Sequence, residues 1–399
     1  MLNLLPTQSK RGIKIIHETL FGIIMHFNPT EEQAMYRETI ARFLDDRYSV
    51  AHRQQFLEQR RGYDPENWSA LADLGVLSLP IPDGLGGLGG TAAEIAIIQE
   101  ELGYRLAVEP FSENIVIPAV ALQEFDDEGR ARTLAAEMQA GTKTVGVALS
   151  EGARRFDAAA IACRAKIDGG NITLLGTKHV VSYPEADFLL VSALLANEDA
   201  ENGLILLLVP AGTEGISTRT YRLIDGTLAA DFEFENTRLT SAAMVASGAG
   251  AVRAIEGMHD RGARAAVAES LGILRRMFEL TTEYTNSRVQ FGRPLTGNQV
   301  VRHRLAEMLM HYELARSVVA GLCIFPAGTH HAAKLVSAAK VTVAKAFDFI
   351  GKQSIQLHGG IGLTDEYELS HHYKRGLALQ EMYGNKREHA LRLAKLSTS

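Results

Sequence analysis

Three short sequence patterns combine residue types that could hold an anionic or planar ligand. The first is R-x-x-F-G-x-P-L, which starts at Arg288, includes Phe291 and is followed by Gln299. A guanidinium group matches a pair of phosphate oxygens, and an aromatic ring can stack on a planar group. An arginine at the end of a helix is also often only a partner of the helix dipole, so this pattern alone does not identify a site.

The other two patterns depend on glycine and serine. Q-x-x-G-G-x-G starts at Gln356, and its adjacent Gly359 and Gly360 allow a ligand to approach the backbone closely, although a plain helix end would look the same. Ser150 and Ser182 each follow an apolar, strand-like run. A hydroxyl at a strand end can hydrogen-bond a planar ring, but it is also an ordinary way for a strand to end.

Other catalytic and metal-binding signatures are not indicated. Residues 84–89 match G-x-G-x-x-G, but Pro80 and Pro82 precede them, and proline breaks the strand that a dinucleotide site requires. We therefore expect a surface loop there. The pairs His330–His331 and His371–His372 lack metal-ligand spacing because adjacent helical residues do not face each other. They are predicted to lie on solvated faces, and no metal is expected.

The composition excludes several classes of protein. The chain has 399 residues, is 46% hydrophobic and 22% charged, and carries a formal net charge of −6. These values are ordinary for a globular protein, and no basic stretch is dense enough for a nucleic-acid partner. The apolar run 204–209 is far shorter than the ~20 residues of a membrane helix, so no membrane span is expected. The two cysteines, Cys163 and Cys323, exclude a disulfide scaffold and fit a cytoplasmic location.

Hydrophobic periodicity predicts an α+β fold. Residues 1–25 form an extension that we expect to be poorly ordered, since its short apolar patch is not followed by the A-x-A site of a signal peptide. Residues 26–142 are predicted to be an all-helical N-terminal domain, with capping boxes that start at Thr30 and Thr91. Short alternating runs in residues 143–243 predict a central antiparallel β domain.

Local signals refine the second half of the chain. The sequence D-G-G-N at residues 168–171 indicates a hairpin turn within the β domain. Residues 244–396 are predicted to be a C-terminal four-helix bundle, because proline and glycine breaks separate long helical segments. These segments span residues 251–288, 297–323, 331–355 and 369–396.

Together these patterns resemble the acyl-CoA dehydrogenase family of flavoproteins. The resemblance runs from Thr30 to about Ala394 and depends on the order and spacing of the arginine and glycine patterns. It is strongest to the small subunits of bacterial pimeloyl-CoA dehydrogenases. It implies the same three-domain fold, with FAD bound between the β domain and the bundle and its ADP part reaching a neighbouring subunit.

The resemblance also implies a role for each motif residue. Ser150 and Ser182 match hydroxyls that contact the flavin, and Val181 matches a flavin-facing backbone position. The residues that match contacts to the ADP part of FAD are Arg288, Phe291, Gln299, Gln356, Gly359 and Gly360. Because these contacts cross a subunit interface, the resemblance implies a dimer or tetramer.

The implied reaction removes two hydrogens from an acyl-CoA thioester. A carboxylate takes the α-proton, the β-hydrogen leaves as hydride to the flavin, and hydrogen bonds stabilise the charge that develops on the thioester carbonyl. An electron-accepting flavoprotein is the implied redox partner.

The catalytic carboxylate is missing from both places where the family puts it. Those positions are Gly384, before the last helix, and Gly262, on the first helix of the bundle. Asp260 and Glu269, the nearest carboxylates on that helix, are therefore the candidates for the base. Asp260 lies about 200° around the helix from Gly262, whereas Glu269 shares its face but lies ~10 Å along the axis.

Two further departures concern the substrate and flavin contacts. The family's Pro-Gly-x-Gly-Ser-Asp turn is replaced by G-A-R-R-F-D, which puts Arg154, Arg155 and Phe156 where small residues help to hold the CoA side. Val180 stands in place of an aromatic residue over the flavin.

Three functions remain open. The first is an FAD-dependent acyl-CoA dehydrogenase that acts on an acyl-CoA such as pimeloyl-CoA, in a homo-oligomer or with a related acyl-CoA dehydrogenase chain. The second is a non-catalytic partner subunit that completes FAD binding. The third is a flavin monooxygenase on the same fold, which the resemblance to a heteromeric dehydrogenase disfavours.

Overall fold

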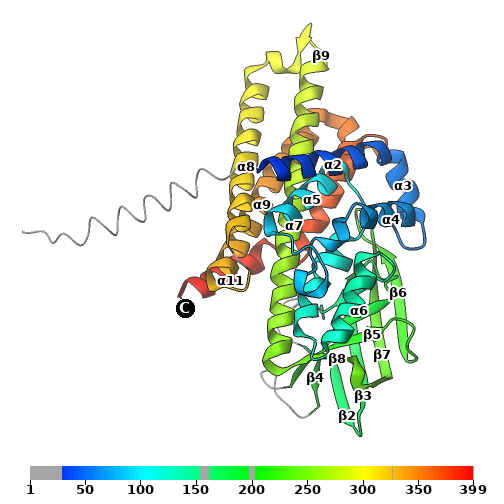
Figure 1. Cartoon of the computed structure of the whole chain (residues 1–399). Helices are drawn as coiled ribbons and strands as arrows, with labels where there is room; N and C mark the ends of the chain where they lie inside the picture. The colour runs from blue at the N-terminus through cyan, green and yellow to red at the C-terminus, as the bar shows by residue number, and fades with distance from the viewer. Residues whose placement is uncertain (1–28, 153–160, 197–202, 326, 399) are drawn as a thin grey trace, which may run out of the picture.

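The computed structural model describes residues 29–152, 161–196, 203–325 and 327–398. In this part of the chain, a group of N-terminal helices, a β-sheet and a C-terminal helical bundle pack together (Figure 1). The long helix α7 (Gly248–Ser287) runs from the sheet to the far end of the bundle. The expectations for residues 1–25 and for Arg154, Arg155 and Phe156 lie outside the described residues.

The N-terminal part is helical, as predicted. Its elements are α2 (Glu31–Arg47), α3 (Val50–Glu58), α4 (Pro65–Asp73), η1 (Val76–Ser78), η2 (Asp83–Leu85), α5 (Ala92–Arg105), η3 (Ser112–Val116), η4 (Pro118–Glu124) and α6 (Glu128–Gln139). The capping boxes predicted at Thr30 and Thr91 are confirmed, with Gln33 and Glu94 as the reciprocal partners. Residues 84–89 form largely exposed turns between η1 and α5, as expected for a surface loop.

The central part is one sheet of strands. Its strands are β1 (Val145–Ala148), β2 (Arg164–Asp168), β3 (Asn171–Ser182), β4 (Phe188–Leu195), β5 (Leu204–Pro210), β6 (Ile216–Arg222), β7 (Leu228–Thr240) and β8 (Met244–Ser247). The order is β6-β7-β3-β2-β4-β5-β8, and β1 pairs with β4. The predicted hairpin is confirmed, since Asp168 pairs with Asn171 across the turn from β2 to β3.

The sheet is mixed rather than wholly antiparallel, which corrects the prediction. Both β1 and β2 run parallel to β4, with Val145 beside Phe188 and Arg164 beside Leu194. Apolar alternation reports which face a residue occupies, but it carries no information on the direction of the neighbouring strand.

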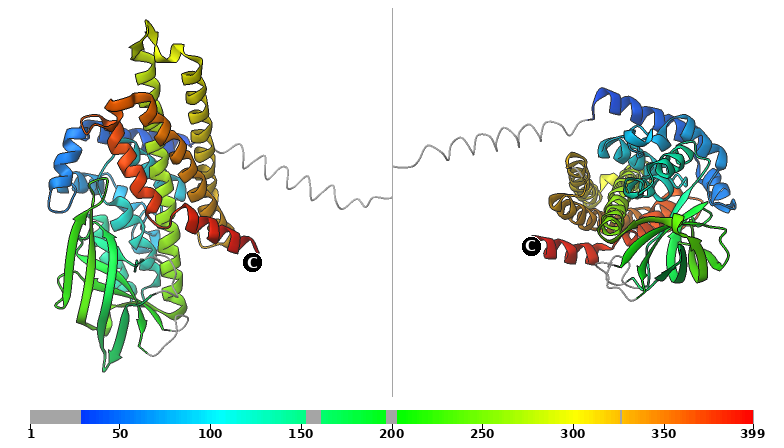
Figure 2. Two further views of the ribbon diagram at one scale, coloured as in Figure 1. Left: turned by 180° about the vertical axis from the view of Figure 1, so that it is seen from behind. Right: turned by 60° about the horizontal axis from the view of Figure 1, so that its bottom comes forward.

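The C-terminal part is a helical bundle in which a short loop separates the last two helices. Its helices are α7, α8 (Gln299–Ile324), α9 (His330–His358), α10 (Glu368–Glu381) and α11 (Lys386–Thr398), and η8 (Gly359–Leu363) follows α9. The helix predicted over 369–396 is broken because Tyr383 and Gly384 have φ values of 52° and 92°, which no α-helix allows. The Asn385 side chain then starts α11 by accepting hydrogen bonds from the backbone of Arg387 and Glu388, each at 3.1 Å. In Figure 2, α11 projects sideways from the bundle.

Two glycines bring the N-terminal part into direct backbone contact with the bundle. A Cβ atom at Gly103 of α5 would lie 2.1 Å from the Glu269 carbonyl oxygen, and a Cβ atom at Gly272 of α7 would lie 1.9 Å from the Glu100 carbonyl oxygen. Only glycine permits this approach, so α5 and α7 cross without an intervening side chain.

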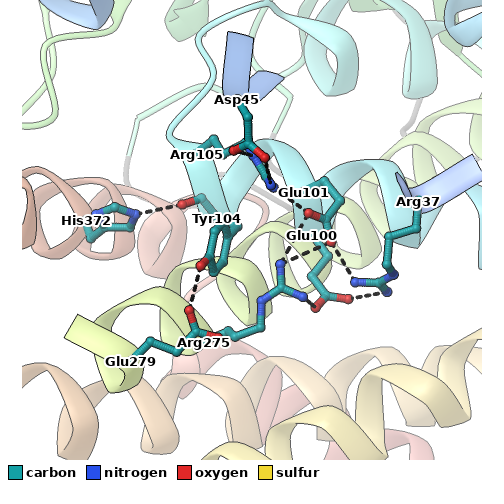
Figure 3. A network of polar contacts seen from close by, with 9 residues as sticks. All are labelled: Arg37, Asp45, Glu100, Glu101, Tyr104, Arg105, Arg275, Glu279 and His372. Atoms are coloured by element: carbon teal, nitrogen blue, oxygen red, sulfur yellow. Dashed lines mark hydrogen bonds and ion pairs between the residues drawn. The ribbon is translucent and has the colours of Figure 1, made fainter. Parts of the chain in front are cut away.

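A network of ion pairs surrounds this crossing (Figure 3). Arg37 and Arg275 both bind the adjacent carboxylates of Glu100 and Glu101, at N–O distances of 2.7 to 3.1 Å. His372 lies within 3.0 Å of the Tyr104 carbonyl oxygen, so α10 joins the same contact.

The histidine pairs do not share one environment. His330 and His331 are exposed, as predicted. His371 and His372 are only 7% and 2% exposed, so the prediction of a solvated face is wrong for that pair. The reason is that α10 packs against α7 and α9, and His372 also reaches the Tyr104 carbonyl of α5, contacts that local periodicity does not report.

No helix within the described ranges has both the length and the apolar character needed to cross a bilayer.

Candidate functional site

A central cavity of about 80 Å³ lies where the sheet, the N-terminal helices and the bundle meet. Residues from β1, β3, η3, α7, the end of α10 and the adjoining loops line it. Those used below are Glu113, Ser150, Val180, Ser182, Met258, His259, Glu381, Met382 and Tyr383.

The two predicted serines lie together in this cavity. The Ser150 Oγ atom is buried and has no hydrogen-bond partner among the described residues, and Ser182 lines the same space. The backbone N–H of His179 donates a hydrogen bond to the Ser150 carbonyl oxygen at 2.9 Å, which links the end of β1 to β3. An unpaired buried hydroxyl is costly, so Ser150 is suited to a ligand that supplies the missing partner.

Val180 and Val181, which directly precede Ser182, lie in different environments. Val181 is 1% exposed, belongs to the apolar core and pairs with Ala230 of β7, and it is not among the described residues that line the cavity. Val180 lines the cavity with a φ of 54°, which is rare for a β-branched residue. Its N–H donates to the Asp231 carboxylate at 3.1 Å, which stabilises this conformation.

Glu113 is a functional candidate that the sequence reasoning missed. It lies on the π-helical turn η3, lines the central cavity and is 5% exposed. Burial raises the pKa of its carboxyl group to about 7, against the lowering effect of the Arg375 charge 3.9 Å away. Arg375 itself is already bound by Glu269 at 2.6 Å and by Asp225 at 2.9 Å. Glu113 can therefore exchange a proton near neutral pH.

Asp260 and Glu269 are both engaged by arginines. Asp260 accepts a hydrogen bond from Arg392 at 2.6 Å, and Glu269 accepts two from Arg375 at 2.6 and 3.0 Å. Both lie outside the set of described residues that line the central cavity.

The remaining motif residues lie at the other end of the bundle. Arg288 ends α7, and Phe291 forms the turn between β9 (Val289–Gln290) and β10 (Arg293–Pro294), near the top of Figure 1. Phe291 is 98% exposed, and a Cβ atom at Gly359 or Gly360 would have no neighbour within 4 Å among the described residues.

The arginine and glycine patterns meet at this end. The rings of His358, just before the glycines, and Tyr284, one turn before Arg288, stack with centroids 4.5 Å apart. Gln356 and Gln299 are exposed, and the Gln299 amide lies 3.5 Å from the His303 ring. The chain therefore brings these two patterns together but separates both from Ser150 and Ser182.

Comparison with known protein families identifies the family of this chain. Residues 30–135 match the family described as acyl-CoA dehydrogenase, N-terminal domain, and residues 248–396 match acyl-CoA dehydrogenase, C-terminal domain. The chain belongs to the acyl-CoA dehydrogenase family. The resemblance inferred from the sequence motifs is thus confirmed, and FAD is the cofactor to which the family points.

Relatives of known name match most of the chain. It is 29% identical over 367 residues to acyl-CoA dehydrogenase IpdE2 of Mycobacterium tuberculosis, covering 92% of this chain and 97% of the relative. It is 28% identical to the human mitochondrial short-chain specific acyl-CoA dehydrogenase, covering 78% and 77%.

Solved structures match the fold. The ChsE4-ChsE5 complex from Mycobacterium tuberculosis matches with a TM-score of 0.84 and 24% identity over 94% of this chain and 99% of the other. A steroid acyl-CoA dehydrogenase variant, Tcur3481-Tcur3483, matches with a TM-score of 0.81 and 26% identity over 92% and 98%.

The Tyr383 ring lies over Gly262, one of the two positions where the sequence resemblance implies a carboxylate in other members of the family. A Cβ atom at Gly262 would lie 2.4 Å from Cδ1 of the Tyr383 ring, well inside van der Waals contact. A side chain at Gly262 would therefore collide with the Tyr383 ring unless the ring moved. Gly384, with a φ of 92°, is also less tolerant of a side chain than an ordinary loop residue.

Proposed function

We propose that this chain is a subunit of an FAD-dependent acyl-CoA dehydrogenase that forms an oligomer with a related chain. The observation that carries this proposal is the buried Ser150 hydroxyl, which faces the central cavity beside Ser182 without a hydrogen-bond partner among the described residues. The isoalloxazine of FAD offers the ring nitrogens and oxygens that such hydroxyls can bind.

The motif residues divide into two sets for FAD. Ser150, Ser182 and the Val181 backbone would hold the flavin ring of this chain's own site. The second set would hold the ADP part of an FAD bound to a neighbouring subunit, and it consists of Arg288, Phe291, Gln299, Gln356, Gly359 and Gly360. The nearly complete exposure of Phe291 supports this second role, because burying a large apolar ring against a partner or a ligand is favourable. When bound, FAD supplies the hydride acceptor that side chains lack.

Glu113 is our proposal for the residue that takes the substrate proton if this chain is itself catalytic. It is the buried carboxyl group of the central cavity within the described residues, whereas Glu381 lies exposed at its rim. A carboxyl group with a pKa of about 7 suits a general base at physiological pH. Asp260 and Glu269 are less suitable as the base, because each carboxylate would have to break an ion pair with an arginine before it could accept a proton.

A non-catalytic role is the second candidate, and the Tyr383 ring favours it. Clefts that hold drug-sized ligands usually measure about 300–1,000 Å³. The central cavity has about 80 Å³, with the Tyr383 ring over Gly262. If this loop stays closed, the chain would complete FAD binding while a related subunit carries the catalytic glutamate.

The partners and substrate follow from the same proposal. A dicarboxylyl thioester such as pimeloyl-CoA is the proposed substrate, a second flavoprotein the proposed electron acceptor, and the cytoplasm the proposed location. The heteromeric ChsE4-ChsE5 neighbour supports assembly with a related chain.

The deciding experiment compares this chain alone with its complex. The chain is purified with and without a co-expressed acyl-CoA dehydrogenase chain that carries the catalytic glutamate, its flavin absorbance is recorded, and pimeloyl-CoA or a straight-chain acyl-CoA is added without oxygen. Bleaching in the chain alone supports the catalytic role. Bleaching only in the complex supports the partner role. A complex that neither contains nor takes up flavin contradicts both.

Glu113→Gln tests the proton role in whichever sample bleaches. We expect a loss of about 10²–10⁴-fold if Glu113 is the base. Glu381→Gln is the matched control at the cavity rim and should leave most of the rate intact.

A further inference from the structure

A second cavity, of about 270 Å³, lies between the start of α5, the middle of α7 and the end of α8. We call it the arginine cavity because Arg261 and Arg264 line it. The described residues that line it do not overlap with those of the central cavity. Its α7 residues are Arg261, Arg264, Ala265 and Ala268, whereas the α7 residues of the central cavity are Met258 and His259.

Arg264 lacks some of the partners that a buried guanidinium group needs, and Arg261 lines the same cavity. Arg264 donates one hydrogen bond, from Nη1 to the Leu322 carbonyl oxygen at 2.6 Å, but its Nε and Nη2 atoms are buried without a partner among the described residues. Burial lowers the pKa of Arg261, and the charge of Arg264 lowers it further. A buried charge of this kind is usually paired or bound to a ligand.

No acidic residue is among the described residues that line the arginine cavity. Asp260 is near enough to favour the charged form of Arg264, but its carboxylate binds Arg392 at 2.6 Å. Glu94 of α5 is likewise committed, to Thr91 and Gln33. The protein itself therefore does not neutralise this pair of charges within the described ranges.

The rest of the lining suits an anion that carries an apolar body. Helix α5 begins at the cavity with Thr91 and Ala92, and the positive end of its dipole favours a negative group there. Ile95, Ala265 and Phe325 supply apolar walls. The volume is large enough for a short organic acid.

We propose that the arginine cavity binds a small carboxylate with a short apolar chain or ring. The carboxylate would bridge Arg261 and Arg264, and the apolar part would pack against Ile95 and Phe325. Arg264 can offer Nε and Nη2 as a parallel pair of donors, which is the geometry that a carboxylate accepts. This site is independent of the flavin and of the proposed dehydrogenase function.

The test measures the binding of hexanoate to the full-length chain by calorimetry. Hexanamide has the same shape without the charge, and inorganic phosphate has the charge without the apolar chain. We expect one hexanoate per chain. Hexanamide should bind about tenfold more weakly because it cannot make charged hydrogen bonds to the arginines. Phosphate should also bind about tenfold more weakly, because it buries no apolar chain.

Methionine variants locate the site. Arg264→Met and Arg261→Met should each weaken hexanoate at least about tenfold, because each removes a charged donor. Arg316→Met is the matched control, since Arg316 lies on α8 with its side chain 61% exposed beside Glu313. If one variant fails to fold, the other carries the test. The proposal is overturned if hexanoate does not bind, if hexanamide or phosphate binds equally well, or if both folded variants retain full affinity.

Discussion

The ring of Tyr383 lies directly against the backbone of Gly262, with Cδ1 2.4 Å from the point that a Cβ atom at position 262 would occupy. These residues come from the loop after α10 and from α7, the two segments in which the sequence resemblance implies a catalytic carboxylate. The Tyr383 ring fills the space that a side chain at position 262 would need. Through the same contact it holds in place the loop that carries Gly384.

Gly262→Ala should therefore destabilise the protein although alanine is the better helix former. Forcing extra volume into a packed contact costs ~1–3 kcal/mol, which exceeds the ~0.5–1 kcal/mol that alanine contributes over glycine in a helix. Urea unfolding measures the difference. Gly321→Ala is the control, because that α8 glycine has no neighbour within 4 Å among the described residues, and it should stabilise. Equal stabilisation by both changes would show that the Tyr383 ring moves aside freely.

Gly384→Glu should restore a carboxylate at a cost in stability. The φ of 92° at this position is unfavourable for any side chain, by ~1–2 kcal/mol. If only the base is missing, acyl-CoA-dependent bleaching of the flavin should rise ~10²–10⁴-fold. Gly384→Gln has the same shape without the base and should show the stability loss alone. Equal rates for the two variants, with flavin bound, would mean that the closed loop and not the missing base limits the reaction.

Glu113→Gln should change how stability depends on pH. The folded-state pKa of Glu113 is raised to about 7 from 4.5, so the folded protein binds more protons than the unfolded chain between these values. Its contribution is complete below pH 4.5 and is lost as pH rises through 7. The free energy of unfolding of wild type, minus that of the variant, should therefore fall between pH 4.5 and 7.

The matched control for this experiment is Glu233→Gln on the exposed face of β7. Its difference curve should be flat across the same range. A flat curve for Glu113→Gln as well would place Glu113 in contact with water and remove it as the proposed base.

Arg375→Met should destabilise the protein strongly. Arg375 is 6% exposed and binds both Glu269 and Asp225, so its removal leaves two buried carboxylates without their cation. Breaking such a buried pair costs ~3–5 kcal/mol. Arg132→Met, which breaks an exposed pair with Glu128, should cost no more than ~1 kcal/mol. Similar losses measured by urea unfolding would contradict the buried role of Arg375.

The sequence predicted most elements because their signals are local. Capping boxes at Thr30 and Thr91 and the D-G-G-N turn act over a few residues, and the structure confirms them. Strand β6 was missed because Ile216–Arg222 is an exposed, largely polar edge strand without an apolar alternation. The parallel pairing of β1 with β4 was missed because it depends on contacts between distant segments.

The site was predicted only where the motifs are contiguous. Ser150 and Ser182 were found from strand ends and family resemblance, and both line the central cavity. Glu113 was not found, because nothing in the surrounding F-S-E-N-I-V-I sequence indicates that its carboxyl group reaches a cavity. The sequence also could not predict that Arg264 has unpaired donors, because that depends on which acceptor groups the neighbouring helices place beside it.

The contact of α5 with α7 through Gly103 and Gly272 has a consequence for how this protein can change over evolutionary time. Because main chain rests on main chain at this crossing, the placement of α7 does not depend on the size of any side chain between the two helices. Both cavities lie along that helix and are lined by residues other than Gly103 and Gly272. Their linings can therefore diversify while the frame is inherited unchanged, so a copy of this gene could lose one chemistry and acquire another without first having to find a new fold.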